Sequence, residues 1–146
     1  MEFDTCFSDL LPAERERLRE KAQMLSFPPG DEVITQGELV EDLMILSSGQ
    51  VRVTQTQGGE QLVEFAGPLG PGEVLGEMSF VDGEPASATL VADGEVEVLA
   101  LARTAIDAMT DADPAFAGRF YRSLFLDLAR RLRSANKRLL AQQSQT

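Results

Sequence analysis

The most informative part of this sequence is GEMSFVDGEPASATL, which runs from Gly76 to Leu90. Glycines and a proline mark tight turns in it, and the small residues ASAT lead into an apolar run. A glycine followed by a short turn and small residues is typical of a loop that offers backbone amides to an anion. Its only charged side chains are Glu77, Asp82 and Glu84, and it contains no lysine or arginine. The stretch therefore predicts an anion site without a cationic side chain.

Length and composition predict one soluble globular domain. A chain of 146 residues is long enough to bury a hydrophobic core. It has no apolar run of about 18 residues, so we expect no membrane-spanning helix. The acidic N-terminus, MEFDTCFSDLL, does not have the pattern of a signal peptide. The single cysteine, Cys6, cannot form an internal disulfide, which favours a cytoplasmic location.

The chain contains no histidine, and this absence excludes several classes of active site. Nucleophile pairs of the Ser–His and Cys–His types are impossible, because both need an imidazole base. A metal centre with imidazole ligands inside a β-barrel is excluded as well. The carboxylates show no spacing that is typical of a catalytic or metal site. We therefore expect a protein that is not an enzyme and that carries no metal or resident cofactor.

Charge is distributed unevenly along the chain. Residues 1–118 contain 23 acidic and 6 basic residues, a balance of −17, whereas residues 119–146 contain 7 basic residues and one acid, a balance of +6. An acidic body argues against nucleic acid as the main partner. The basic end is expected to be a solvated face or to dock onto an acidic partner.

The hydrophobic pattern changes from helical to strand-like along the first two thirds of the chain. Apolar residues between Ser8 and Leu25 fall on one helical stripe, which FPPGD ends. From Glu32 to Leu101, short β-rich runs alternate with turn signals. These runs are EVIT, LMIL, QVRVTQT, QLVEFAG, SATLVA and EVEVLAL. Short strands at this spacing predict an antiparallel barrel or roll rather than a parallel α/β sheet.

The last third of the chain is predicted to be helical, with a short helix over 104–109 and a long one over 114–142. The residues Tyr121, Phe125, Leu128, Leu132, Ala135 and Leu139 recur in steps of four and three, which is a heptad-type seam. Phe116, Phe120 and Leu124 form a neighbouring stripe. We expect one stripe to pack on the β-body and the seam to form a homodimer. A helix packed only on its own domain is the alternative.

This order of elements, together with several motifs, resembles the cyclic nucleotide-binding domain, the sensor domain of the catabolite activator protein family. The motifs are PPGDEVITQGE, LMILSSGQVRV and LGPGEVLGEMSF. The resemblance covers nearly the whole chain, from Phe7 to about Leu140. It implies a mainly β fold, an antiparallel β-roll or jelly roll of about eight strands with an N-terminal helix and a long C-terminal helix.

The resemblance also implies a single domain, residues 1–146. Within it we expect an N-terminal helical segment over 1–29, a β-roll over 30–102 and C-terminal helices over 103–146. The family's phosphate-binding cassette corresponds to residues 76–90.

The cassette is where the family holds its ligand, a cyclic nucleotide such as cAMP or cGMP. The resemblance implies that Glu77 accepts a hydrogen bond from the ribose 2′-hydroxyl and that Gly76 and Met78 line the sugar. Amides of the turn over 78–80 and of residues 87–88 face the phosphate. The implied ligand-binding residues are Gly76, Glu77, Met78, Ser79, Ala86, Ser87 and Ala88.

The chain departs from the family's pattern at Ala86. The usual sequence is GEPRSATV, whose arginine pairs with the cyclic phosphate, whereas this chain reads GEPASATL. A hydrogen bond to a charged group contributes about 1.5–3 kcal/mol, so its loss predicts binding weakened by roughly 10- to 100-fold. Alternative sources of the charge are Arg52 turned inward from its strand, and Arg119 or Arg122 of the long helix.

The resemblance therefore predicts a non-catalytic regulatory module that binds a cyclic nucleotide or related small ligand and signals through its long helix to a separate effector protein. The second hypothesis is a degenerate domain that binds no cyclic nucleotide and acts as a dimeric protein-interaction module. Ala86 favours the second hypothesis, whereas Glu77 and Ser87 favour the first. Only AQQSQT follows Leu140, so we expect no DNA-reading domain on this chain.

Overall fold

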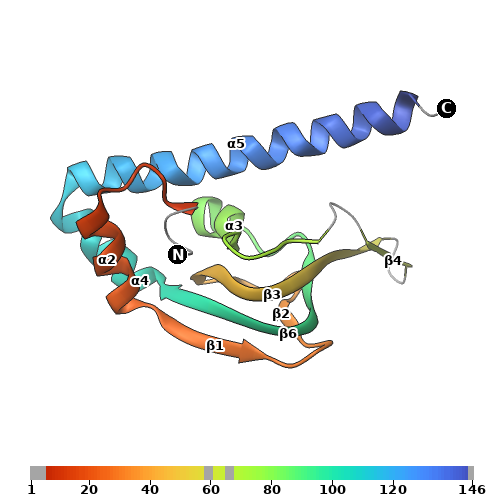
Figure 1. Ribbon diagram of the computed structural model, residues 1–146, viewed down its shortest axis with the longest axis horizontal. Helices are drawn as coiled ribbons and strands as arrows, with labels where there is room; N and C mark the ends of the chain where they lie inside the picture. The colour runs from red at the N-terminus through yellow and green to blue at the C-terminus, as the bar shows by residue number, and fades with distance from the viewer. Residues whose placement is uncertain (1–5, 58–60, 65–67, 145–146) are drawn as a thin grey trace.

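The structure is a computed structural model that describes residues 6–57, 61–64 and 68–144 (Figure 1). The antiparallel sheet lies along one side of the molecule, and the longest helix runs across it, with a short helix between the two. In chain order the elements are α2 (Pro12–Lys21), β1 (Gln23–Phe27), β2 (Glu32–Ile34), β3 (Asp42–Gln57), β4 (Gln61–Glu64), β5 (Val74–Leu75), α3 (Glu77–Asp82), β6 (Thr89–Ala102), α4 (Arg103–Ala112) and α5 (Pro114–Ser144). The predicted class, a mainly antiparallel β fold with flanking helices, is confirmed.

Six strands among the described residues form one sheet, in the order β1–β6–β3–β4, with β2 on β6 and β5 on β3. The predicted number of about eight strands is not confirmed, because pairs of predicted runs continue into one another. LMIL and QVRVTQT form β3, while SATLVA and EVEVLAL form β6. Residues 65–67 of the QLVEFAG run lie outside the described residues.

An irregularity in the middle of β3 depends on Gly49. Its φ is +89°, and a Cβ at this position would lie 2.2 Å from the carbonyl oxygen of Glu95. The register of the β3–β6 ladder shifts on both sides of Ser48, next to this glycine. An irregularity of this kind lets two long strands bend while they stay paired. Each of the two strands therefore contains two of the runs that were predicted as separate strands.

The helix predicted from Ser8 to Leu25 is shorter in the structure, and this prediction was wrong at its C-terminal end. Helix α2 begins at Pro12, and the side chain of Glu14 accepts a hydrogen bond from the Leu11 N–H. Residues Gln23–Phe27 instead form β1, an edge strand that pairs with β6 in antiparallel orientation. This pairing is a tertiary interaction, and it outweighs the local helical pattern.

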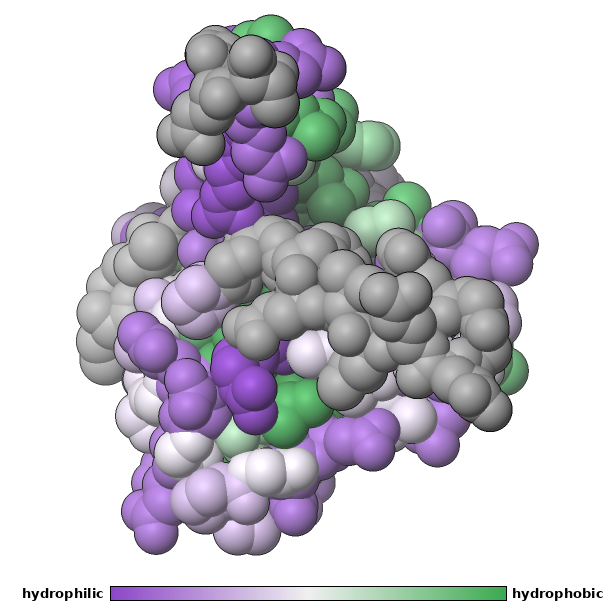
Figure 2. Space-filling model, turned by 90° about the vertical axis from the view of Figure 1, so that its right-hand side faces the viewer, coloured by the Kyte–Doolittle hydropathy of each residue, from purple (hydrophilic) through white to green (hydrophobic). Residues whose placement is uncertain are grey.

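The C-terminal helices are those predicted, with slightly different limits. Helix α5 begins at Pro114, and Asp113 Oδ1 accepts hydrogen bonds from the N–H groups of Ala115 and Phe116. Figure 2 shows the far end of α5 standing above the body, with hydrophilic residues on one side and hydrophobic residues on the other. The stripe of Phe116, Phe120 and Leu124 is buried, as predicted for a face that packs on the body.

Buried apolar residues form two clusters on opposite faces of the sheet. Successive side chains of β3 point to different clusters: Ile45 belongs to the cluster beneath the helices, and Leu46 belongs to the cluster on the other face, inside the roll. Phe120 lies at the centre of the first cluster, with ring centroids of Phe7 and Phe80 at 5.5 and 6.0 Å. The first cluster thereby packs α5 against α3, which carries part of the predicted cassette.

Candidate cyclic nucleotide site

Gly76 turns the chain from β5 into α3. Its φ is +83°, and a Cβ there would lie 3.0 Å from Cγ1 of Val40 and 3.5 Å from Cδ1 of Ile34. A larger residue would be strained by the backbone and crowded by the loop that follows β2. The tight turn makes Glu77 the first residue of α3 and directs the helix beneath α5.

Glu77 is buried, with 4% of its surface exposed, and its partner is Arg131 of α5. Nη1 of Arg131 donates to Glu77 Oε1, and Nη2 donates to the carbonyl oxygen of Val74 and, at 3.0 Å, to Glu73 Oε2. One guanidinium therefore joins α5 to three residues of the segment over 73–77.

Further charged residues surround this contact. Arg130 donates to Asp127 Oδ1 at 2.6 Å and lies 3.6 Å from Glu73. Asp127 is itself 5% exposed. Three carboxylates and two guanidinium groups thus meet between α5 and the cassette, which leaves one excess negative charge there.

Burial raises the pKa of the Glu77 carboxyl, because removal from water disfavours its charged form. The positive charge of Arg131 opposes this rise, while the carboxylates of Asp127 and Glu73 add to it. Glu14 shows the opposite behaviour, since the hydrogen bond from Arg119 lowers its pKa. Burial therefore disfavours the charged form of Glu77, and carboxylates with shifted pKa values are common at functional sites.

We expect the variant Glu77→Gln to raise the free energy of unfolding at about pH 7, because glutamine has nearly the same shape without the buried charge, while Arg131 keeps its ion pair with Glu73. The sign follows from the raised pKa. Glu77 stabilises the folded state fully only below its unfolded pKa, and this stability is lost as the pH rises through the folded pKa. As the pH rises from the unfolded pKa of Glu77 through its folded pKa, urea unfolding should therefore show a smaller loss of stability for the variant than for the natural chain.

Glu14→Gln is the matched control with the opposite expected sign. The lowered pKa of Glu14 means that its contribution is present above the unfolded pKa and is lost as the pH falls through the folded one. This variant should be less stable at about pH 7. If Glu77→Gln were also less stable there, pairing with Arg131 would outweigh burial.

Arg131 is not among the residues predicted from the sequence. The two arginines of the long helix that were predicted as alternatives bind elsewhere: Nε of Arg119 lies 2.8 Å from Glu14 Oε1, and Nη1 of Arg122 lies 2.9 Å from Asp9 Oδ1. A signal was nevertheless present, because the buried stripe that ends at Leu124 continues in steps of three and four to Asp127 and Arg131. Polar residues on a body-facing stripe indicate a buried partner.

The third alternative, Arg52, lies on β3 between two residues of the roll interior. Val51 and Val53 are buried in the cluster inside the roll. Since side chains alternate along a strand, Arg52 takes the opposite face. The structure therefore gives no support for an Arg52 turned into the roll.

The remaining predicted residues occupy different environments. Met78 is 56% exposed, whereas Ser79 is buried at 8%. Ala86 and Ala88 pack against the cluster inside the roll. Ser87 is exposed, and its carbonyl oxygen accepts a hydrogen bond from Gln55 Nε2.

The backbone of Ala86 is already bonded to the loop after β2. Its N–H donates to the carbonyl oxygen of Glu38 at 2.9 Å, and its own carbonyl accepts from the N–H of Gly37 at 2.8 Å. This pairing fixes the cassette against the loop and leaves the Ala86 amide unavailable to a ligand.

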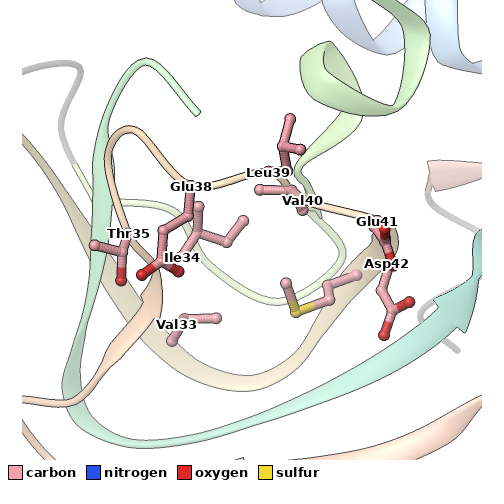
Figure 3. Close-up of a pocket in the computed structure, with 9 residues that line it drawn as sticks. Val33, Ile34, Thr35, Glu38, Leu39, Val40, Glu41 and Asp42 are labelled. Carbon is pink, nitrogen blue, oxygen red and sulfur yellow. The ribbon is translucent and has the colours of Figure 1, made fainter. Parts of the chain in front are cut away.

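A cavity of about 310 Å³ opens beside this loop (Figure 3). Apolar side chains of Val33, Ile34 and Met44 line part of it. Glu38 lies at one side, and Glu41 and Asp42 lie at the other. No lysine or arginine lines it, so a phosphate there meets carboxylates and no cation.

Neither a metal-binding cluster nor a membrane-spanning helix is present within the described ranges. No group of three or more Cys, Asp or Glu residues in these ranges has an arrangement that could hold a metal ion. None of the helices described combines the length and apolar character needed to cross a membrane.

Sequence comparison identifies relatives of the chain. The sequence pattern of the family described as "Cyclic nucleotide-binding domain" matches residues 24–113. The "Cyclic AMP receptor protein" of Thermus thermophilus is 38% identical over 133 residues, which are 91% of this chain and 59% of the relative. The "cAMP-dependent protein kinase regulatory subunit" of Mycosarcoma maydis is 33% identical over 92 residues, 62% of this chain and 17% of that protein. The chain thus spans less than two thirds of the length of these curated relatives.

Comparison with solved structures agrees. The catabolite activator protein of Thermus thermophilus superposes with a TM-score of 0.77 at 34% identity, over 95% of this chain and 63% of that one. A cyclic nucleotide-binding domain from Methylobacillus flagellatus gives a TM-score of 0.85 at 23% identity, over 96% of this chain and 83% of that one, and it shows the likeness of fold alone.

Proposed function

Because the chain belongs to the cyclic nucleotide-binding domain family, we propose that it is a non-catalytic sensor that binds a cyclic nucleotide and signals to a separate effector protein through α5. The observation that supports this most is the buried Glu77, which is held between the cassette and Arg131 of α5. Buried carboxylates with a charged partner and a shifted pKa cluster at functional sites.

The proposed ligand is cyclic AMP or cyclic GMP. In this proposal Glu77 accepts the hydrogen bond of the ribose 2′-hydroxyl, and Gly76 and Met78 line the sugar. Ser79, Ser87 and Ala88 face the phosphate, and Ala86 stands where the family's arginine would be. A ligand that engages Glu77 competes with or reshapes its contact with Arg131, so its binding free energy acts directly on α5.

Calorimetric titration with cyclic AMP and cyclic GMP tests the proposal. We expect binding in the natural chain, weakened by Ala86, and loss of binding in Glu77→Ala. Glu84→Ala is the matched control, because this exposed cassette residue has no proposed ligand contact and its removal should preserve or strengthen binding of an anion. No heat at millimolar ligand from the folded protein contradicts the proposal and supports a protein-interaction role without nucleotide.

The proposal includes a homodimer formed by the seam of α5. Phe125, Leu132 and Leu139 of this seam are 63%, 64% and 56% exposed in the single chain. Apolar residues repeated in steps of four and three on an exposed helix face are typical of a coiled-coil contact. A second copy of the helix would bury them.

We expect Leu132→Glu to make the protein monomeric in sedimentation experiments at tens of micromolar, because it places a charge in the seam. Leu126→Glu is the control, since Leu126 is exposed at 43% on α5 but lies off the seam. A monomeric natural chain, or equal dissociation by both variants, would contradict a dimer of this kind.

A further inference from the structure

A second cavity, of about 440 Å³, lies between α3 and the loop over residues 39–41. Residues of α3 and of the turn that follows it form one wall, and the loop forms the other. Arg103, the first residue of α4, also lines it. The nucleotide proposal gives this groove no role.

The walls of the groove expose apolar side chains. Leu39 is 69% exposed and Val81 is 46% exposed, and they come from opposite walls. Figure 3 shows Leu39 projecting from its loop on the side of α3. Met78, on the same helix as Val81, is 56% exposed. Exposed apolar residues that gather around one hollow are typical of a protein-binding surface, whereas isolated ones are common everywhere.

The rim of the groove is acidic. Glu41, Asp82 and Glu84 line it and are exposed. Within the described part of the chain, none of the three forms an ion pair. Arg103 offsets only one of these three charges and forms no ion pair with them, since its guanidinium donates to the carbonyl oxygen of Phe80 and lies 4.1 Å from the centre of the Phe80 ring.

We propose that this groove is the docking site for a segment of a partner protein in which an apolar side chain is flanked by lysine or arginine. The apolar side chain would lie between Leu39 and Val81, and the flanking cations would meet the carboxylates of the rim. Charge complementarity of this kind raises the association rate and selects the partner. The acidic rim repels phosphate, which argues against nucleic acid and anionic membranes as occupants.

The groove is placed so that it can respond to the cassette. Its loop wall is continuous with Gly37 and Glu38, which exchange hydrogen bonds with Ala86, and its helical wall is α3 itself. Both walls are therefore attached to the cassette. Docking as proposed does not require nucleotide, so its test is independent of ligand binding.

Selection of peptides from a random display library against the purified full chain, without nucleotide, tests the proposal. We expect the enriched peptides to place lysine or arginine beside leucine or phenylalanine. Their binding should weaken at least tenfold in Val81→Ser and in Glu84→Lys, two substitutions at exposed positions. Met24→Ser is the matched control, because Met24 is 49% exposed on β1 and should leave binding unchanged.

The proposal is overturned if the enriched peptides lack cationic residues, or if the two groove variants bind them as well as the natural chain does. The C-terminal end of α5, with Lys137, Arg138 and two exposed leucines, has the same chemistry as the proposed partner. A change of oligomeric state in Val81→Ser, measured by sedimentation, would assign the groove to a second copy and would also overturn it.

Discussion

An Ala86→Arg variant is expected to bind cyclic AMP roughly 10- to 100-fold more tightly than the natural chain. The expected gain is the contribution of charge-assisted hydrogen bonds from a guanidinium to the cyclic phosphate. The gain should also shrink as the salt concentration rises, since part of it is electrostatic.

The structure supports residue 86 as the position for this test. The two backbone hydrogen bonds of Ala86 to Gly37 and Glu38 hold its main chain in place whatever its side chain. Its methyl group packs against the cluster inside the roll, so a longer side chain starts from the roll side of the cassette. The arginine of α5 that reaches the start of the cassette, Arg131, is already engaged with Glu73 and Glu77.

Ala86→Gln is the matched control for this experiment. It adds a long polar side chain without a charge, so it should give little of the gain. Equal tightening in both variants would mean that size rather than charge limits binding. An unchanged affinity in a folded Ala86→Arg protein would place the phosphate away from residue 86.

The largest effect on stability is expected for Phe120→Ala, which should cost about 3–5 kcal/mol in the free energy of unfolding. Phe120 is fully buried and contacts three other rings besides its neighbour in sequence, since Phe116 lies at 5.7 Å in addition to Phe7 and Phe80. Its removal leaves a cavity where the N-terminal segment, α3 and α5 meet. Urea unfolding followed by circular dichroism measures the loss.

Leu126→Ala on the same helix is the control for Phe120→Ala. Leu126 is 43% exposed, so truncating it should change stability by less than about 1 kcal/mol. A loss for Phe120→Ala no greater than that of the control would show that the contacts between α5 and α3 contribute little, and would weaken the proposed route of signalling through them.

The contact between α5 and the cassette is the reason that changes in this region are expected to affect both stability and binding. Arg131 donates to Glu77, Glu73 and the Val74 carbonyl at once, so α5 is positioned in part by Glu77, which is proposed to hold the ligand. A change in the contacts of Glu77 is therefore expected to act on α5 directly, because no other element lies between Glu77 and Arg131. Such direct coupling needs only a differential affinity of the ligand for two positions of α5.

Much of the fold could be predicted from local patterns. Alternation in β3 and β6 identified the strands, and the buried stripe from Phe116 to Leu124 identified the inner face of α5, because both signals repeat over several residues. The turn at Gly76 and the absence of an arginine at position 86 could also be recognised from the sequence, since each depends on one residue type at one place in a motif.

Other features depended on contacts between distant segments. The first part of the strand Gln23–Phe27, as far as Leu25, was predicted as helix because its partner, β6, lies more than sixty residues away, and local propensity carries no information about that pairing. The fusion of predicted runs into β3 and β6 likewise depends on the ladder between them.

The family and the departure from its usual motif at Ala86 could therefore be recognised from the order and type of neighbouring residues alone. Which arginine of α5 reaches Glu77 could not, because it depends on contacts between distant parts of the chain. Arg119, Arg122 and Arg131 have the same chemistry, and their partners Glu14, Asp9 and Glu77 are selected by how far along α5 each one lies. That choice is made by the packing of the helix across the sheet, which no local pattern encodes.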